Sequence, residues 1–375
     1  NELDGAYEQH VGDFPAYLCA LASPDAMVRD YAFAMIDSEA EHQGSVYPAT
    51  AAVIPWLANL LSHPNADRSG LLRAIVSYAE NAAPYADDGD DEDEEDEDED
   101  EDEEDDDNPA HAVVAAIGAA WPQIWPLFET STARADRAFV LVIAKHAPEA
   151  RPMLVAMARD HDDAAFRACA IDALTGRRGY DVDKVAASMW DRDPVVRAVT
   201  AIRLGLTLGP EAPASVVPAL ANALRGWHEI ESGWAELPFT DGHLLGSLAL
   251  ALGSIRSSDA RTLAPLLCAT IDETDGVSAT AVGRGLLALV LGRGELPFDA
   301  AFIDVLDTLA TSDEFWRFNV NAGEILDLWN LRDGIGDDAK AQLAAIVREL
   351  RAAEDPAAML HAKIHEDDGD DDGDD

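Results

Sequence analysis

The sequence is poor in positive charge, in aromatic side chains and in cysteine. Lysine and arginine together number 26 against 73 aspartates and glutamates, so the formal net charge is −47 at pH 7. A field of this sign repels phosphate groups, which excludes direct nucleic acid binding and binding to anionic membranes, and it attracts basic partners. Aromatic residues make up only 7% of the 375 residues, whereas hydrophobic residues make up 48%. Apolar segments rich in alanine favour closely packed helices over a sheet.

Long apolar runs are also missing. No 18-residue apolar stretch occurs, so we expect no transmembrane helix, and no basic segment followed by an apolar one opens the chain. The three cysteines, Cys19, Cys169 and Cys268, lie far apart in apolar helical surroundings. We therefore expect buried free thiols in a reducing compartment, and a cytoplasmic protein. The first residue is Asn1 rather than methionine, which leaves open whether the N-terminus is complete.

An internal repeat is the strongest feature that is present. Arg137, Arg167 and Arg197 follow one another at intervals of 30 residues, and each is followed by alanine and an apolar helical segment. Ahead of Arg197, Pro194 suits a first helical turn and Asp193 suits the N-cap, while Gly209 suits the end of the helix. A fixed period of this length is typical of stacked helix pairs, because one amphipathic pair cannot bury both its faces alone.

The sequence therefore predicts an all-α fold, an α-solenoid of helix pairs. No segment shows a sustained two-residue alternation, so we expect no strands. We assign helical repeats to residues 1–86, a disordered acidic insertion to 87–108, and the continuing array to 109–365, closed by a cap helix over 337–353. Residues 366–375 form an acidic, disordered tail. The run at 87–107 supplies 20 acidic residues and the tail 8, which leaves 45 acidic against 26 basic residues, a net charge of −19 for the body.

The Asp-Pro-Val-Val-Arg pattern of residues 193–197, followed by alanine, resembles HEAT repeats, and the pattern recurs across most of the chain outside the acidic segments. The segment His-Gln-Gly-Ser-Val-Tyr-Pro-Ala-Thr at 42–50 is similar to one in a group of bacterial HEAT-repeat proteins, most of them without assigned function. The resemblance implies a ladder between neighbouring helices, formed by an aspartate and the arginine four residues later: Asp25/Arg29, Asp163/Arg167, Asp193/Arg197 and Asp313/Arg317. Arg73, Arg137 and Arg284 share the register but lack that aspartate.

The acidic insertion is the first candidate for partner binding. Self-repulsion and the lack of apolar side chains predict an extended, disordered chain. Such a chain advances about 3.3–3.6 Å per residue, close to the ~3.4 Å between phosphates of one nucleic acid strand. It would thus fit the basic groove of a nucleic-acid-handling protein, although a purely solubilising role explains it equally. The residues that we single out are Asp90, Asp91, Glu92, Asp93, Glu94, Glu95 and Asp96.

Two further segments are candidates for partner binding. Residues 226–241 interrupt the array as a long loop containing Trp227, His228, Trp234 and Phe239, and tryptophan is favoured at interface hot spots. The alternative is that both tryptophans fold back between helices. In the second segment, His42, Gln43 and Tyr47 form a polar cluster in a loop over 42–50, before a helix expected at 51–61; a structural turn explains them as well.

Several chemical motifs are weak. Residues 368–373 match the first half of an EF-hand loop, but the chain stops before the acid at position 12, so only weak divalent-cation binding by the acidic segments is expected. The Gly-x-Gly-x-x-Ala of residues 283–288 lies inside a helical pattern, where its glycines favour close helix packing over dinucleotide binding. His361 and His365 supply half of a zinc site without a third ligand. Phe315, Trp316 and Phe318 have the spacing of a helix whose aromatic residues lie in the core.

These observations favour a non-enzymatic protein with no cofactor and no resident metal. The interpretation is a cytoplasmic bacterial scaffold that binds a basic protein, most sharply an immunity protein that neutralises a toxin. The alternatives are an acidic adaptor or chaperone for basic, nucleic-acid-binding proteins, and an enzyme whose site carries no recognisable motif. Plentiful carboxylates alone do not identify an acid–base pair.

Overall fold

The computed structural model describes residues 14–42, 45–86, 108–176, 180–240, 243–291, 300–318, 322 and 339–359. Almost all the regular structure in these ranges is helical. The fold is therefore the all-α solenoid type expected from the repeat. Asp90–Asp96, the EF-hand-like tail, and His361 and His365 lie outside the described residues.

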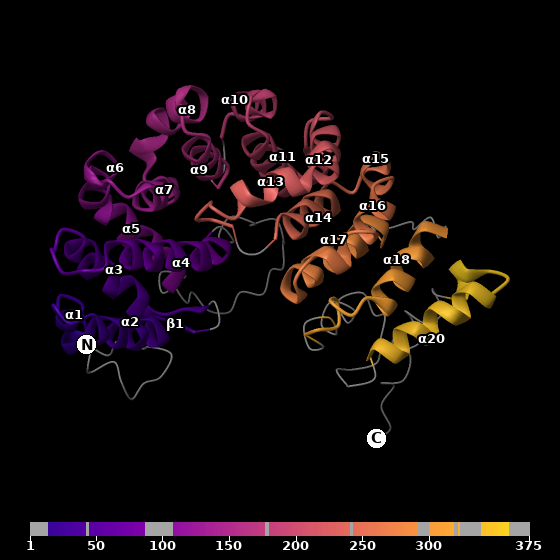
Figure 1. The fold of residues 1–375 in the computed structure, drawn as a ribbon, viewed down its shortest axis with the longest axis horizontal. Coiled ribbons are helices and arrows are strands. Elements are labelled where there is room, and N and C mark those ends of the chain that lie inside the picture. The colour runs from indigo at the N-terminus through magenta and orange to yellow at the C-terminus, as the bar shows by residue number, and fades with distance from the viewer. Residues whose placement is uncertain are drawn as a thin grey trace, which may run out of the picture. The chain divides into compact units, whose positions relative to one another are not determined.

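The chain divides into two compact units, residues 1–178 and 179–375. The described residues of the first unit form helices and one hairpin of two-residue strands (Figure 1). Its elements are α1 (Phe14–Ala20), α2 (Ala26–Ala40), β1 (Glu41–His42), β2 (Ser45–Val46), α3 (Pro48–Leu60), α4 (Arg68–Ala86), α5 (Pro109–Ile124), α6 (Pro126–Thr130), α7 (Arg134–Ile143), η4 (Ala144–His146), η5 (Pro148–Ala150), α8 (Arg151–Asp160) and α9 (Ala164–Thr175).

The regular structure in the described residues of the second unit is all helical, with short 3₁₀ helices at several turns. Its elements are α10 (Val182–Ala186), η6 (Ala187–Trp190), α11 (Pro194–Leu208), η7 (Gly209–Glu211), α12 (Val216–Arg225), α13 (Trp227–Trp234), α14 (Leu244–Ile255), α15 (Ser258–Arg261), α16 (Ala264–Cys268), η8 (Ile271–Glu273), α17 (Gly276–Leu291), α18 (Ala300–Thr311) and α20 (Ala339–Ala352).

The repeated helices begin where the sequence predicts. Asp25, Asp163 and Asp193 occupy the N-caps of α2, α9 and α11, and their carboxylates accept the backbone N–H two residues later at 3.0, 2.9 and 2.9 Å. Each cap satisfies one of the backbone donors that an unprotected first turn leaves without a partner. Pro194 follows directly as the first residue of α11. Gly209 ends the same helix at φ +49°, a conformation that glycine adopts without the strain of a Cβ.

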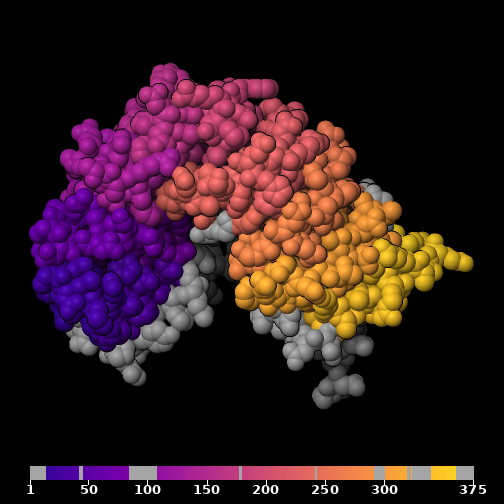
Figure 2. All heavy atoms as spheres, in the orientation of Figure 1, coloured from indigo at the N-terminus to yellow at the C-terminus, as the bar shows by residue number. Residues whose placement is uncertain are grey.

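Within each unit the helices stack in two layers. In the first unit α4, α7 and α9 pack in succession along one layer, and α3 packs on α5 in the other. In the second unit α11, α14 and α17 form the corresponding succession, with α12 and α16 packed against it. The atoms of successive segments are in contact along each unit (Figure 2). Each helix therefore buries apolar surface on its neighbours, as stacked repeats require.

The contact between α14 and α17 is unusually close. A Cβ built on Gly285 would lie 2.4 Å from the backbone oxygen of Ala249, and one on Gly253 would lie 2.8 Å from the backbone oxygen of Gly285. A Cβ on Gly283 would lie 2.3 Å from a ring carbon of Phe315. The Gly-x-Gly-x-x-Ala stretch thus serves helix packing, which confirms the packing interpretation over a dinucleotide site.

The structure corrects several expectations. The segment at 42–50 is not a simple loop: β1 and β2 pair antiparallel, with Glu41 opposite Val46, and the following helix begins at Pro48. The segment at 226–241 contains the helix α13. Phe315 and Trp316 are buried as expected, but residues 313–318 form turns rather than a helix, and Phe318 is exposed. Cys169 is buried, whereas Cys19 is exposed.

Candidate functional site

The aromatic insertion is a packing element. Trp227, Ile230 and Trp234 recur at helical spacing on α13 and are all buried. A Cβ on Gly233 would meet the side chain of Val195 at 2.6 Å, so α13 lies directly against the start of α11. Burial of both indoles supports the alternative that they fill the space between helices. Of the insertion's predicted contact residues, His228 remains exposed.

The buried indoles are surrounded by other rings. The Trp227 and His228 rings are tilted by 35° with centroids 3.7 Å apart, and the Trp227 and His243 rings meet edge to face at 4.8 Å. Phe239 is partly buried, lies 6.5 Å from the Trp234 ring and carries the guanidinium of Arg203 at 5.2 Å from its centroid. These contacts hold the connection from α13 to α14 in place.

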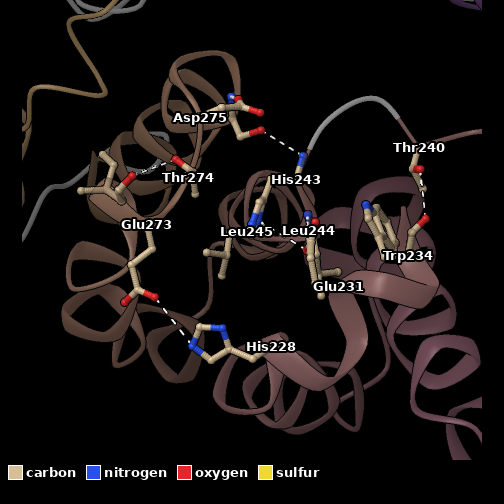
Figure 3. A network of polar contacts seen from close by, with 12 residues as sticks. His228, Glu231, Trp234, Thr240, His243, Leu244, Leu245, Glu273, Thr274 and Asp275 are labelled. Atoms are coloured by element: carbon tan, nitrogen blue, oxygen red, sulfur yellow. Dashed lines mark hydrogen bonds and ion pairs between the residues drawn. The ribbon is translucent and has the colours of Figure 1, made fainter. Parts of the chain in front are cut away.

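A polar network joins α13, α14 and α17 (Figure 3). His243 caps α14, because its Nδ1 accepts the Leu245 N–H at 3.3 Å. Glu231 on α13 accepts the Leu244 N–H at 3.2 Å, and the His243 N–H donates to the Ser278 hydroxyl at 2.9 Å. The network thus satisfies the orphan backbone donors at the start of α14 from two neighbouring helices.

Two carboxylates border this network. The Ser278 N–H donates to Asp275 at 2.8 Å, and this bond is the main reason that the pKa of Asp275 lies below its ordinary value. Glu273 lies 3.7 Å from the exposed His228 Nε2, a weak contact between η8 and α13 (Figure 3). Both arrangements stabilise helix ends, and neither brings an acid and a base together at a cavity.

The second candidate, the hairpin segment, is also tied to the helices around it. The Thr50 hydroxyl accepts the Tyr47 N–H at 2.9 Å and donates to the Ala40 carbonyl, so it closes the path from α2 to α3. Tyr47 is the N-cap residue of α3 and is partly buried. These contacts support the structural-turn interpretation for Tyr47. Gln43 and the His42 side chain lie outside the described residues.

An acidic pair lies at the foot of this hairpin. The Ser77 hydroxyl donates to Glu41 at 2.8 Å, and the Tyr78 hydroxyl donates to Asp37 at 3.4 Å. Burial, and then the charge of Glu41, raise the pKa of Asp37; burial, and then the charge of Asp37, raise the pKa of Tyr78. Among the described residues no lysine or arginine pairs with either carboxylate.

The register arginines mostly bond to their own turns. Arg29, Arg167 and Arg197 each donate to the backbone carbonyl six residues earlier, at 2.8, 2.7 and 2.7 Å. Each of these three bonds thus fastens the loop before a helix to that helix, within one repeat, whereas the expected ladder runs between neighbouring helices. An inter-repeat pair does occur, but through a different arginine: Arg134 makes two bonds of 2.9 Å to Asp163.

The other register positions differ again. The guanidinium of Arg137 lies between the rings of Phe128 and Phe166, 4.6 and 4.7 Å from their centroids. Arg317 pairs with Glu314 at 3.2 Å. Asp313 instead pairs with Lys340, which lowers the pKa of that aspartate. The recurring arginines therefore differ in their bonding partners from one repeat to the next.

Two surface cavities stand out in the described ranges. One, of about 470 Å³ in the second unit, is lined by η6, α11, α12 and α13, with Arg197 and Glu229 among its polar groups. The other, of about 880 Å³ in the first unit, is an apolar groove between α1 and α3. Each has an exposed tryptophan in its lining: Trp190 at 83% and Trp56 at 60% relative exposure.

Sequence reasoning missed both tryptophans as surface residues. Trp56 sits on a helix that is apolar on most of its surface, and Trp190 directly precedes the capping segment of α11. The sequence did contain a signal for Trp56, because its position falls outside the apolar stripe that its helix buries. That stripe, at Val53, Ile54, Leu57, Ala58 and Leu61, leaves Trp56 on an adjoining face.

Within the ranges that the structure describes, every helix is too short or too polar to cross a membrane. The same ranges hold no group of three or more histidine, cysteine, aspartate or glutamate side chains with metal-binding geometry.

No protein-family model and no curated protein matches the chain. A crystal structure of an engineered protein is similar at 16% identity over 88% of this chain and 97% of that chain, with a TM-score of 0.29. A likeness at this level carries no argument about function. The helices and their packing define the class, an all-α solenoid.

Proposed function

We propose that this chain is a non-catalytic, HEAT-type scaffold that binds a basic protein partner. In its sharpest form the proposal is an immunity protein that neutralises a toxin by occupying the toxin's basic surface. The observation that supports it is the acidic excess outside residues 87–107 and 366–375, where the sequence carries 45 acidic against 26 basic residues.

The basic residues have structural partners. Arg29, Arg167 and Arg197 clamp their own turns, and the buried Lys145 bonds to Glu80. Arg134 is occupied by Asp163. These five basic side chains are thus engaged within the fold, and the paired Arg134 remains about half exposed.

The acidic pair at the hairpin is a local example. Burial, and then the charge of Glu41, raise the pKa of Asp37, and the hydroxyls of Ser77 and Tyr78 are the hydrogen-bond donors to Glu41 and Asp37 within the described ranges. A lysine or arginine side chain from a partner would relieve this repulsion, because an opposite charge within about 4–6 Å favours the ionised carboxylate.

An acidic surface acts mainly on the rate of encounter. Complementary charges raise association rates by about 10–10³-fold at low ionic strength, and salt removes most of that gain. Tight, selective neutralisation additionally needs close contact with one partner. The proposal therefore predicts both strong salt dependence and a single preferred partner.

The test is co-expression with the products of neighbouring genes, followed by kinetics on any toxic product that is neutralised. Residues 87–107 are replaced by a neutral glycine–serine linker of equal length, with a shuffled acidic run as the matched control. We expect the linker variant to associate about 10-fold more slowly at low salt, and the shuffled control to match the unaltered chain. If no toxic neighbour is neutralised and the rates do not change, the proposal fails.

An adaptor or chaperone for basic proteins is the second candidate, favoured by the low complexity of the acidic run. Such a protein binds several basic proteins with micromolar affinity and steep salt dependence, whereas an inhibitor prefers one. A panel of unrelated basic proteins separates the two. An enzyme would need a nucleophile or an acid–base pair in a cavity. The cavity around Arg197 holds one carboxylate, Glu229, and no histidine or cysteine, whereas the groove on the first unit has Cys19 and His63 in its lining but no carboxylate.

A further inference from the structure

The groove on the first unit differs from the rest of this acidic chain. Its volume is about 880 Å³, and its lining contains no aspartate, glutamate, lysine or arginine. His63 is the one imidazole in that lining, at one end. The groove is therefore suited to apolar side chains, in a protein whose net charge is −47.

The groove exists because of how three helices pack. Helices α1 and α3 both pack on α2, and the groove opens between them. Phe14 and Val53 are buried and form its floor, whereas Cys19 and Trp56 are exposed. At one end the Asn65 side chain donates to the Ala22 carbonyl at 3.3 Å, which ties the turn after α3 to the turn after α1.

The dimensions match a short helix. Helix α3 has 13 residues and runs about 20 Å at 1.5 Å per residue, whereas α1 has 7 residues and runs about 10 Å, so both walls of the groove are present over about two helical turns. Amphipathic helices bind such grooves through apolar side chains at positions i, i+3 or i+4, and i+7. Trp56 provides an exposed aromatic side chain of the type that dominates binding energy at interfaces.

Charged residues around the groove favour one sign of charge on the polar side of a bound helix. Asp25 and Asp67 are exposed in the turns at one end, and both carboxylates accept backbone N–H groups of their own helix starts. The nearby arginines, Arg29 and Arg68, donate to the backbone carbonyls of Ser23 and Leu61. The two arginines keep their charge and balance the two aspartates, but over residues 14–86 the sequence carries seven acidic against three basic residues. The flanks of a helix in the groove lie nearest to this acidic excess, so lysine and arginine are favoured there over glutamate and aspartate.

We propose that the groove between α1 and α3 binds an amphipathic helix of the basic partner, with the apolar face of that helix on Phe14, Val53 and Trp56 and its basic face outward. This inference rests on the proposed function, because it names the site by which the solenoid holds a basic protein.

Cys19 makes the proposal directly testable, because it is exposed and lines the groove, while Cys169 is buried. The probe is a designed helical peptide with leucines at i, i+3 and i+7 and lysines elsewhere. A second peptide carries glutamates in place of the lysines. The rate at which iodoacetamide alkylates Cys19 in the full chain is measured by mass spectrometry with and without each peptide.

We expect the lysine peptide to slow Cys19 alkylation about 10-fold or more at saturation, and the glutamate peptide to leave it unchanged. Trp56→Ala is expected to weaken the lysine peptide about 10- to 30-fold, in the range of interface hot spots. Trp190→Ala is the matched control, because Trp190 is more exposed and lies outside this groove, and it is expected to leave binding unchanged. Ala52→Trp, which fills the groove at an exposed position, is expected to abolish protection.

The other outcomes contradict the inference. Binding of the lysine peptide without protection of Cys19 places the basic partner elsewhere and leaves the proposed function intact. If the glutamate peptide protects Cys19 as well as the lysine peptide does, the inference that the bound helix is basic is wrong. Cys19 protection that appears with rising protein concentration identifies a second copy as the occupant, and Cys19 that reacts faster once residues 1–13 are removed identifies that segment.

Discussion

The close contact between α14 and α17 predicts a large effect from one added methyl group. In Gly285→Ala the new Cβ would lie 2.4 Å from the backbone carbon and oxygen of Ala249 and 2.8 Å from the Ala249 Cβ. Backbone atoms cannot rotate away, so the two helices must separate by roughly 1 Å to reach ordinary contact distances.

The free energy follows from two opposing effects. Replacing glycine by alanine inside a helix stabilises by about 0.5–1 kcal/mol. Overpacking a tight contact costs typically about 1–3 kcal/mol, and a clash with backbone belongs at the upper end of that range. We therefore expect Gly285→Ala to destabilise the second unit by about 2 kcal/mol. Gly118→Ala is the control: its Cβ would lie 3.4 Å from the nearest atom, the His146 oxygen, so we expect a gain of about 0.5 kcal/mol.

Urea unfolding followed by circular dichroism measures both variants. Because the chain has two compact units and need not unfold in one step, hydrogen exchange is measured in parallel on peptides from α14 and α17. Faster exchange confined to these helices is the expected result. If Gly285→Ala is as stable as the unaltered chain and its exchange is unchanged, the close-packing argument is wrong.

Three further predictions concern the repeats. Asp163→Ala removes the N-cap of α9 and the partner of Arg134, so we expect a loss of about 1–2 kcal/mol in urea unfolding. The Arg134 bond lowers the pKa of Asp163, so this stability is present above about pH 4 and is lost as pH falls through the lowered pKa; a variant that shows the same acid sensitivity as the unaltered chain contradicts this. Glu80→Gln leaves the buried Lys145 unpaired and is expected to cost about 2–3 kcal/mol, less than for a fully buried pair because Glu80 is partly exposed, while adding Lys145→Met restores most of the loss in a double-mutant cycle. Trp234→Ala leaves a cavity under α13 and is expected to cost about 3–5 kcal/mol by thermal unfolding; a loss below 1 kcal/mol shows that the indole is not a packing element.

Local rules explain what was predictable. An aspartate, an optional proline and an apolar run define a helix start within a few residues, so Asp25, Asp163 and Asp193 identify their helices without any tertiary information. The period of the arginines likewise predicts stacking, because helices at regular spacing have similar neighbours. Close helix packing at Gly283 and Gly285 was also predictable, because two glycines within an apolar helical pattern leave room for a neighbouring helix.

What escaped prediction depends on neighbours that the sequence does not show. The hairpin has two residues in each strand, too few for an alternation to be detected, and its contacts come from Ser77 and the Thr50 hydroxyl. The direction of each arginine depends on which carbonyl or ring lies within reach, so Arg137 stacks between two phenylalanines where Arg197 clamps a turn. The helical pattern places Trp56 off the buried stripe of α3, but the groove beside it depends on the gap between α1 and α3, which no local pattern encodes.

The central claim, that this acidic solenoid holds a basic protein, is tested most directly by titrating the chain into a neutralisable toxin from a neighbouring gene at low and at high salt. The account predicts a stoichiometric complex that abolishes toxicity, with an association rate that falls steeply as salt rises. Failure to bind any basic protein at low salt, or binding that does not change with salt, would contradict it.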